Sequence, residues 1–349
     1  KHGDEVILLG ATCSVMSNAV LRLGATPVYS DIDIETYGSS LFGIESCIND
    51  STRMIVAQHS FGIPCDIDKI AKLAKLRNIF LLEDCALTLG SKLDNTVVGN
   101  FGDAALFSTD HSKPINTLTG GLIYSQDRQL IDSLRISRDH CNQLPIGKQY
   151  ALWRRLLLER WFCNSKRYGS MGLVNLIYTV LIYSSILTQP FLANDFKSSK
   201  FTQDYPYPAK LPSFLAQLGL YEIRRWEANM KLRIKLKDEL LILFSQSVLM
   251  NNIPAVYADD SRVIVPLRFA WNGANGQSYR SDISKFIDVG WTWFMSPIVA
   301  TKEPLENYKY VSGSCPISEN IGPGMVNIPC NIKENEHEKI LSKVKNVLS

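Results

Sequence analysis

The sequence predicts an α/β protein built on a largely parallel β-sheet. Over the first 125 residues, short continuous apolar runs alternate with segments whose apolar residues recur at helical spacing. Continuous apolar strands are typical of a parallel sheet whose two faces are covered by helices. The composition of 46% apolar and 20% charged residues is ordinary for a soluble globular protein and excludes a disordered, collagen-like or multi-span membrane chain. The length of 349 residues favours two domains.

Each expected element follows from a local pattern. Apolar runs predict strands, in chain order, at 6–9, 27–30, 54–58, 80–82, 104–108 and 121–125. Helical spacing predicts helices near 14–23 and over 66–76, and one long helix over 213–244. Later patterns predict a strand at 263–267 and helices at 282–289 and 334–348. We therefore expect a large domain over 1–205 and, over 206–349, a linking helix with a smaller C-terminal α+β domain.

Residues 140–205 are expected to form a basic and hydrophobic insertion. Residues 148–167 carry six basic side chains and one acidic side chain, a net charge of +5; since the whole chain carries +3, the remainder sums to −2. Residues 168–194 then contain no charge in 27 positions, which is long enough to span a bilayer, although a crossing would separate the two halves. Two interpretations stay open: a helical insertion packed on the protein body or on a partner subunit, and peripheral contact of 148–194 with an anionic membrane surface, which Trp153 and Trp161 would suit.

Net charge, cysteine spacing and histidine positions argue against several other classes. A formal net charge of +3 is too small for a nucleic-acid-binding signature, so we expect no nucleic-acid partner. None of the eight cysteines forms a Cys-x-x-Cys pair, which removes the usual evidence for a zinc-ribbon or thioredoxin-like site. His2, His140 and His337 stand apart from one another and from acidic pairs, so no metal site is expected. Reduced thiols and a cytoplasmic location are expected.

An acid and a lysine follow two of the predicted strands. Asp84 ends a very apolar strand, and open α/β sheets bind their ligands at the carboxyl ends of strands. Lys113 comes 29 residues later, shortly after the strand at 104–108 and before Gly120-Gly121. Pyridoxal phosphate needs this pair of groups: the lysine forms a Schiff base, and the carboxylate holds the pyridine nitrogen protonated. The pattern alone is weak evidence, because loop lysines are usually solvated.

A series of ordered motifs carries a family resemblance. These motifs are Gly3-Asp4-Glu5-Val6-Ile7, Gly24-Ala25-Thr26-Pro27-Val28, Gly62-Ile63-Pro64-Cys65-Asp66, Glu83-Asp84-Cys85-Ala86, Val98-Gly99-Asn100-Phe101-Gly102-Asp103, and Phe107-Ser108 with Lys113 and Gly120-Gly121. With them the sequence resembles the DegT/DnrJ/EryC1/StrS family of sugar aminotransferases, densely over 3–125, not across about 140–205, and loosely towards the end. The resemblance implies the type I aminotransferase fold, a pyridoxal 5'-phosphate cofactor and a homodimer. It also implies glutamate as amino donor and a keto-sugar, mostly nucleotide-linked, as acceptor in surface-polysaccharide or amino-sugar biosynthesis.

The resemblance assigns roles to four matching residues. Lys113 matches the lysine that holds the cofactor and later acts as general base for the 1,3-proton shift. Asp84 matches the acid that pairs with the pyridinium nitrogen. Ser108 matches a serine that binds the cofactor phosphate, and Thr12 matches a threonine at the strand–helix turn beside the cofactor. Lys113 also argues against the dehydratases of this family, which have histidine at that position.

Other positions depart from the family pattern. Cys13 stands where many members have an aromatic residue against the cofactor ring, and Leu87 stands where Gln or His is usual; we assign both to the cofactor site. Pro208 replaces the usual Asn of the neighbouring-subunit loop. The family's phosphate-cradling loop precedes the Gly-Asp-Glu-Val-Ile motif, so we expect the chain to be N-terminally incomplete. These departures leave open a degenerate, non-catalytic member that binds a membrane or an enzyme complex.

A few residues near the motifs are expected to be mainly structural. His59 is expected to cap a strand end, and Glu83 to orient a strand end or a partner subunit. For His111, a local structural role and a catalytic role stay open. The aromatic cluster of Trp291, Trp293 and Phe294 is expected to be core, with lining of the sugar pocket as the alternative.

Overall fold

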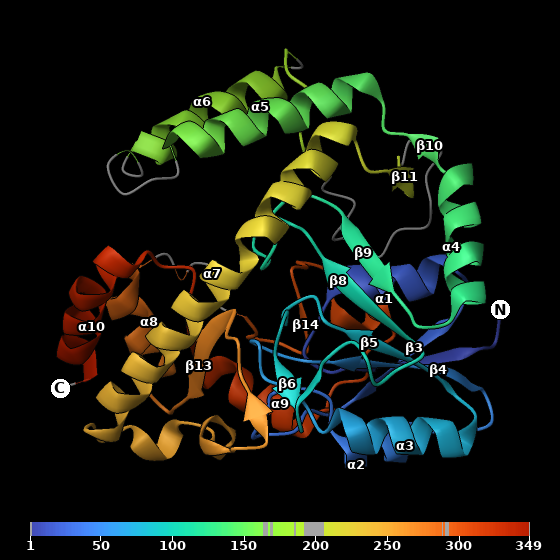
Figure 1. The fold of residues 1–349 in the computed structure, drawn as a ribbon, viewed down its shortest axis with the longest axis horizontal. Coiled ribbons are helices and arrows are strands. Elements are labelled where there is room, and N and C mark those ends of the chain that lie inside the picture. The colour runs from blue at the N-terminus through green and yellow to red at the C-terminus, as the bar shows by residue number, and fades with distance from the viewer. Residues whose placement is uncertain are drawn as a thin grey trace.

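The computed structural model describes residues 2–162, 167, 170–184, 186–191, 206–287, 289 and 293–348. Its largest sheet has six strands in the order β3-β1-β4-β5-β8-β9 (Figure 1). Their bounds are β1 (Glu5–Leu9), β3 (Thr26–Ser30), β4 (Thr52–Gln58), β5 (Phe80–Asp84), β8 (Ala104–Ser108) and β9 (Gly121–Tyr124). The first five strands in this order pair in parallel, and β9 runs antiparallel to β8. The expected mixed, mostly parallel sheet is confirmed.

The described residues form ten α-helices around and beyond this sheet. Their bounds are α1 (Ser14–Arg22), α2 (Leu41–Cys47), α3 (Ile67–Arg77), α4 (Arg128–His140), α5 (Ile146–Phe162), α6 (Met171–Tyr183), α7 (Ser213–Ser245), α8 (Gly276–Ser284), α9 (Pro316–Ile321) and α10 (Glu334–Leu348). Ile7 and Ile55 of the central strands pack against α2 and α3, which lie below the sheet in Figure 1. Val6 and Val56 point to the opposite face and pack with residues of α1 and with Tyr308. Because both faces are buried, the strands read as continuous apolar runs.

Short strands connect distant parts of the chain. They are β2 (Thr12–Cys13), β6 (Lys92–Leu93), β7 (Thr96–Val97), β10 (Asn142–Gln143), β11 (Ala209–Lys210), β12 (Arg262–Val263), β13 (Arg268–Asn272), β14 (Ile298–Val299) and β15 (Met325–Pro329). The parallel pair of β2 and β14 matters most for function, because it sets the turn before α1 beside the C-terminal part of the chain. This pairing is not visible in the sequence pattern, since each strand has two residues.

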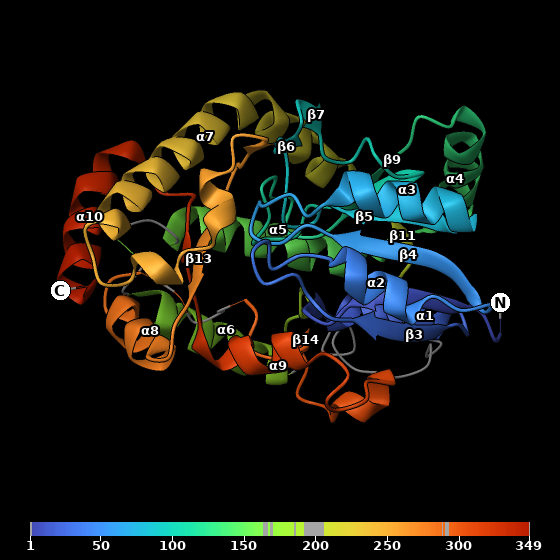
Figure 2. The same cartoon turned by 90° about the horizontal axis from the view of Figure 1, so that it is seen from below.

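The C-terminal elements gather at one end of the molecule, and α2, α3 and α4 lie towards the other (Figure 2). The long helix α7 and the terminal helix α10 agree with the sequence prediction. The strand expected at 263–267 is wrong: the ladder strand is β13, which pairs antiparallel with β15. Pro266 lacks an N–H, and the N–H groups of Val265 and Leu267 donate to Ser91 Oγ and to Phe61 O instead of to a ladder.

Two further expectations concern the helix at 282–289 and the boundary between the two domains. The helix expected at 282–289 is displaced, because α8 begins at Gly276 and ends at Ser284. The expected domain boundary between 205 and 206 stays a prediction, because residues 192–205 lie outside the described residues. One buried apolar cluster contains Leu9 and Phe61 from the first half together with Phe269 and Met325 from the second, so the two halves share a core.

The insertion contains the helices α5 and α6, which run antiparallel across the start of α7 (Figure 1). Leu152 of α5 packs with Leu144 and Leu215 in a small buried cluster that anchors the insertion. Arg155 of α5 donates to Asn175 Oδ1 of α6 at 3.3 Å. Among the described residues, no helix has both the length and the apolar character needed to cross a bilayer. We call these two helices the α5–α6 pair.

Candidate active site

Asp84 lies at the carboxyl end of β5 and is buried, with 4% of its surface exposed. Its Oδ1 accepts a hydrogen bond from the N–H of Ala86 at 2.9 Å, which is the one donor to this carboxylate among the described residues. Burial raises the pKa of Asp84, while the Ala86 N–H and the charge of Lys113 act in the opposite direction. A buried carboxylate with a single donor fits a cationic partner that a ligand supplies.

Lys113 lies in a loop that begins at the end of the neighbouring strand β8. The N–H of Thr117 donates to Thr109 O at 2.8 Å, and the N–H of Thr109 donates to Gly120 O at 3.0 Å, so the two ends of the loop are joined. Gly120 has φ +126°, and a Cβ there would lie 2.9 Å from Leu211 Cδ1 and 2.9 Å from Thr109 Oγ1. The glycine therefore permits the closed loop that presents Lys113.

The ammonium of Lys113 faces an aromatic ring. Its Nζ lies 5.4 Å from the centroid of the Trp293 ring, and no carboxylate of the described chain pairs with it. The indole Nε1 of Trp293 is buried without a hydrogen-bond partner in the part of the chain that the structure describes. The ring thus lies beside Lys113 and also packs against a buried apolar cluster. Lining of a sugar pocket by the aromatic cluster stays a prediction. Phe294 is core, stacked on Phe61 with ring centroids 6.0 Å apart, and Trp291 lies outside the described residues.

The turn before α1 enters the same site. The N–H of Thr12 donates to Pro297 O at 3.1 Å, and Cys13 pairs with Val299 in the register of β2 and β14. Burial raises the pKa of the Cys13 thiol, while the charges of Lys113, Asp110 and Asp84 also act on it. Cys13 therefore lies within electrostatic range of the lysine and the acid.

Leu87, Ser108 and Pro208 are the remaining residues that the sequence analysis singled out. Leu87 is buried just beyond β5, and Ser108 ends β8, where its Oγ accepts from the N–H of Asp110 at 3.4 Å. Ser108 also lines a mainly apolar cavity of about 640 Å³ that reaches Trp226 of α7 and does not include Asp84 or Lys113. Pro208 is exposed, immediately before β11. Any contact of Pro208 with a neighbouring subunit stays a prediction.

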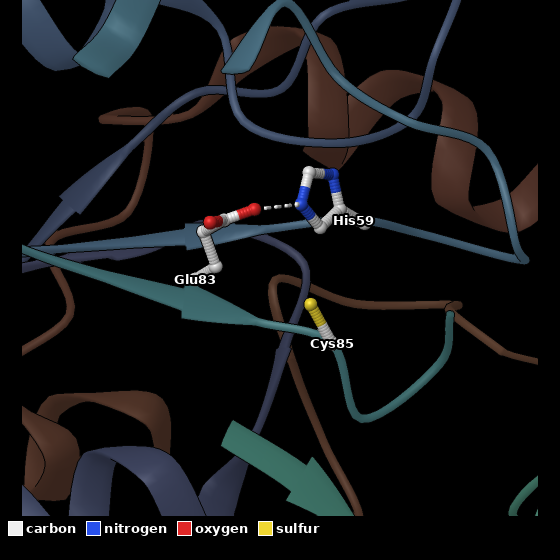
Figure 3. A group of neighbouring side chains, drawn as sticks. All are labelled: His59, Glu83 and Cys85. Carbon is white, nitrogen blue, oxygen red and sulfur yellow. Dashed lines mark hydrogen bonds and ion pairs between the residues drawn. The ribbon is translucent and has the colours of Figure 1, made fainter. Parts of the chain in front are cut away.

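Glu83 forms a buried network behind the site (Figure 3). Its two oxygens accept the N–H groups of Gly99, Phe101 and Gly102, each at 2.7 Å, and Oε2 lies 3.3 Å from Nε2 of His59. Burial would raise the pKa of Glu83, but the hydrogen bonds from His59 and from the backbone N–H groups of Gly102 and Gly99 hold it below its usual range. The carboxylate thus fixes the loop after β7, in agreement with an orienting role.

His59 does more than cap a strand. Its Nδ1 accepts the N–H of Cys65 at 3.2 Å, so Nε2 carries the proton that faces Glu83. Cys85 lies beside this pair, and ligand atoms of His59, Glu83 and Cys85 lie within 4.8 Å of one another (Figure 3). Because the Glu83 oxygens already accept three backbone N–H groups, we interpret the group as a hydrogen-bonded network rather than as a metal centre.

Two other histidines have acidic partners. His111 Nδ1 lies 2.8 Å from Asp110 Oδ1, a hydrogen bond that raises the pKa of His111, and its ring centroid lies 5.7 Å from that of Phe191 in the insertion. His111 therefore connects the Lys113 loop to the insertion. The expectation that His337 stands apart from acids is wrong: its Nδ1 lies 2.9 Å from Glu239 Oε2, which joins α10 to α7.

Solved structures of similar shape define the class of this fold. An aminotransferase from Psychrobacter cryohalolentis matches with a TM-score of 0.69 at 19% identity, covering 99% of this chain and 81% of that chain. A DegT DnrJ EryC1 StrS aminotransferase from Brucella abortus matches with a TM-score of 0.68 at 18% identity, covering 100% of this chain and 80% of that chain. The chain therefore has the type I aminotransferase fold, as the sequence predicts.

The sequence comparisons show which family this chain resembles. Residues 1–154, less than half of the chain, match the model of the DegT/DnrJ/EryC1/StrS aminotransferase family. GDP-perosamine synthase from Escherichia coli O157:H7 is 43% identical over 132 residues, 38% of this chain and 36% of the relative. A UDP-N-acetyl-3-dehydro-alpha-D-glucosamine 3-aminotransferase from Acidithiobacillus ferrooxidans is 37% identical over 139 residues, 40% of this chain and 38% of the relative. The matched stretch thus spans less than two fifths of either relative's length.

Proposed function

We propose that the protein is a pyridoxal-phosphate-dependent aminotransferase that moves an amino group from glutamate to a keto-sugar. The observation that carries the proposal is the placement of buried Asp84 at the carboxyl end of β5 and of Lys113 in the loop after the neighbouring strand β8, where the charge of Lys113 acts on Asp84. A fold neighbour, the Streptococcus pneumoniae protein Spr1654, was solved in a PLP form (TM-score 0.66, 17% identity, covering 99% of this chain and 81% of that chain). The names of the curated relatives support a nucleotide-linked sugar as acceptor.

The residues present fit this cofactor. Asp84 has one protein donor and would hold the protonated ring nitrogen, while Lys113 has no carboxylate partner among the described residues and is available to bind the cofactor aldehyde. When bound, the cofactor supplies an electron sink for deprotonation next to the amino group. Ser108 would contact the cofactor phosphate. Thr12 would lie beside the cofactor, at the strand–helix turn. Cys13 and Trp293 would border the ring.

Lys113 has the central chemical role in the proposal. Displaced by the amino donor, its amine would take a proton from the donor carbon and deliver it to the cofactor carbon, so one group acts first as base and then as acid. Asp84 would stay ionised against the ring nitrogen during this transfer, because the opposite charge offsets the effect of burial. The Trp293 ring would keep water from one side of Nζ.

The other parts of the proposal follow from the resemblance. A homodimer would complete the site, and a cytoplasmic location suits glutamate and a nucleotide-linked sugar; the seven described cysteines are all free thiols. A non-catalytic member of the family is the alternative, which the departures at Cys13, Leu87 and Pro208 favour. The intact Asp84 and Lys113 favour the enzyme.

The amino-donor half-reaction tests the proposal without knowledge of the sugar. The full chain, loaded with pyridoxal phosphate, is mixed with glutamate, and the release of 2-oxoglutarate is measured against the amount of protein. We expect one equivalent from the wild type and none from Lys113→Ala. Lys75→Ala, a change of an exposed lysine on α3, is the matched control and should match the wild type. Failure of the loaded wild type to release 2-oxoglutarate would favour the non-catalytic alternative.

A further inference from the structure

The helix α6 presents an apolar face to solvent. The side chains of Leu173, Leu176, Ile177, Val180 and Tyr183 are all more than half exposed, and Tyr183 reaches 86%. These positions recur at helical spacing and lie opposite Tyr178, which is buried. In an ordinary surface helix the exposed face is polar and the buried face is apolar. Here the outward face has no charged side chain.

The outward face of α5 repeats this arrangement. Ile146, Tyr150 and Trp153 are 69%, 61% and 48% exposed, whereas Ala151 and Leu152 on the opposite side are fully buried. Arg160 is also exposed and continues this outward stripe about two turns beyond Trp153. Figures 1 and 2 show α5 and α6 side by side, so the two exposed apolar stripes lie on adjoining helices, and we call the two stripes together the platform. The platform is larger than the scattered apolar residues that monomeric proteins normally expose.

Charge identifies the kind of partner that would cover this platform. Residues 148–167 carry six basic side chains and one acid, Glu159. The Glu159 carboxylate accepts from Arg155 Nε at 2.6 Å, so these two charges offset each other, and Lys148 is buried. The exposed positive charges include Arg160 and Arg167. No charge follows in 168–194. A positive region that adjoins an apolar face with Trp and Tyr matches the headgroup region of an anionic lipid bilayer, where aromatic rings and arginines bind and aliphatic side chains enter the acyl boundary.

We propose that the α5–α6 pair is an interfacial docking element for anionic membranes. The pair lies on the surface with its outward face buried in the headgroup boundary; it does not cross the bilayer, since α6 has 13 residues. A second copy of this chain fits less well, because two copies facing each other through this platform would bring their net positive charges together. The proposal does not depend on the aminotransferase activity.

The docking element is also connected to the candidate active site. Phe191 follows α6 and contacts the ring of His111, which lies two residues before Lys113. Lys148 and Arg154 of α5 donate to the carbonyls of Gln189 and Thr188, each at 2.9 Å, and so hold this segment against the helix. Docking through the outward face would therefore place the Lys113 loop close to the lipid surface.

Vesicle flotation of the full chain tests the proposal. We expect the wild type to float with vesicles of equal parts phosphatidylcholine and phosphatidylglycerol at low salt. Binding should fall at least about tenfold on pure phosphatidylcholine or in high salt, because several basic residues contribute near the surface. The double variant Leu176→Ser/Val180→Ser and the single variant Arg160→Glu should each weaken binding. Val248→Ser, at an even more exposed apolar position that follows α7, is the matched control and should bind like the wild type.

Self-association is measured on the same samples by light scattering, and folding is checked by circular dichroism. A folded wild type that stays in solution with the anionic vesicles would overturn the proposal. So would binding that Leu176→Ser/Val180→Ser leaves unchanged. Loss of an oligomer in this double variant, without any lipid binding by the wild type, would assign the platform to a second copy of the chain instead. Because no readout uses catalysis, these outcomes are independent of the proposed function.

Discussion

The hydrogen bonds of Glu83 make a quantitative prediction about stability. Glu83→Gln keeps one carbonyl oxygen, which can still accept from Phe101 and Gly102, but it turns an NH₂ group towards the N–H of Gly99 and towards His59. The two charge-assisted hydrogen bonds from the Gly99 N–H and from the His59 Nε2–H are lost, and at about 1.5–3 kcal/mol each they sum to about 3–6 kcal/mol. We expect Glu83→Gln to lower the free energy of unfolding by about 3–5 kcal/mol, measured by urea denaturation of the cofactor-free chain.

The pH dependence gives this prediction a second readout. Because the folded pKa of Glu83 lies below its unfolded value, its contribution is present at neutral pH and is lost as the pH falls through the folded value. The difference between wild type and Glu83→Gln should therefore shrink below roughly pH 4. Glu227→Gln, which removes an exposed ion pair with Lys231, is the control and should leave stability unchanged. A loss below about 1 kcal/mol for Glu83→Gln would refute the reasoning.

Three further predictions concern the candidate active site. Asp84→Asn should lower kcat/KM by about 10²–10³-fold, since it removes the partner of the charged ring nitrogen. Burial raises the folded pKa of Asp84, so its ionisation costs stability at neutral pH. Urea denaturation of the cofactor-free variant should therefore show no loss of stability. Trp293→Ala removes the ring beside Lys113 and should weaken cofactor binding about twofold to thirtyfold in a spectroscopic titration, whereas Trp293→Phe should be milder. Gly120→Ala should cost about 1–3 kcal/mol of stability, because of its positive φ and its close contact with Leu211, and thermal unfolding measures this loss.

The central strands of the sheet could be predicted because they are buried on both faces and read as continuous apolar runs. The edge strand β9 is also an apolar run, although all four of its residues are exposed. The pattern was misleading at 264–267, where the apolar residues Ile264, Val265 and Leu267 are buried outside any strand and Pro266 cannot donate. Apolar character reports burial, and it does not distinguish a buried strand from a buried irregular segment.

The candidate site could be predicted only where a residue follows a strand. Asp84 and Lys113 were found because they come at the carboxyl ends of β5 and β8. Trp293 was expected to be core. Its approach to Lys113 was not predicted, because it depends on the pairing of β2 with β14, which lie almost 300 positions apart in the chain. Two-residue strands have no periodicity, so this contact required the structure. The His59–Glu83 contact likewise depends on the tertiary register of β4 and β5.

The attachment of the cofactor tests the central claim most directly. The full chain is incubated with pyridoxal phosphate, reduced with borohydride, digested and analysed by mass spectrometry. The account predicts a pyridoxyl group on the peptide that contains Lys113, at a level well above that of any exposed lysine, and its loss in Lys113→Ala. Labelling spread evenly over the exposed lysines, with none enriched at Lys113, would contradict the account.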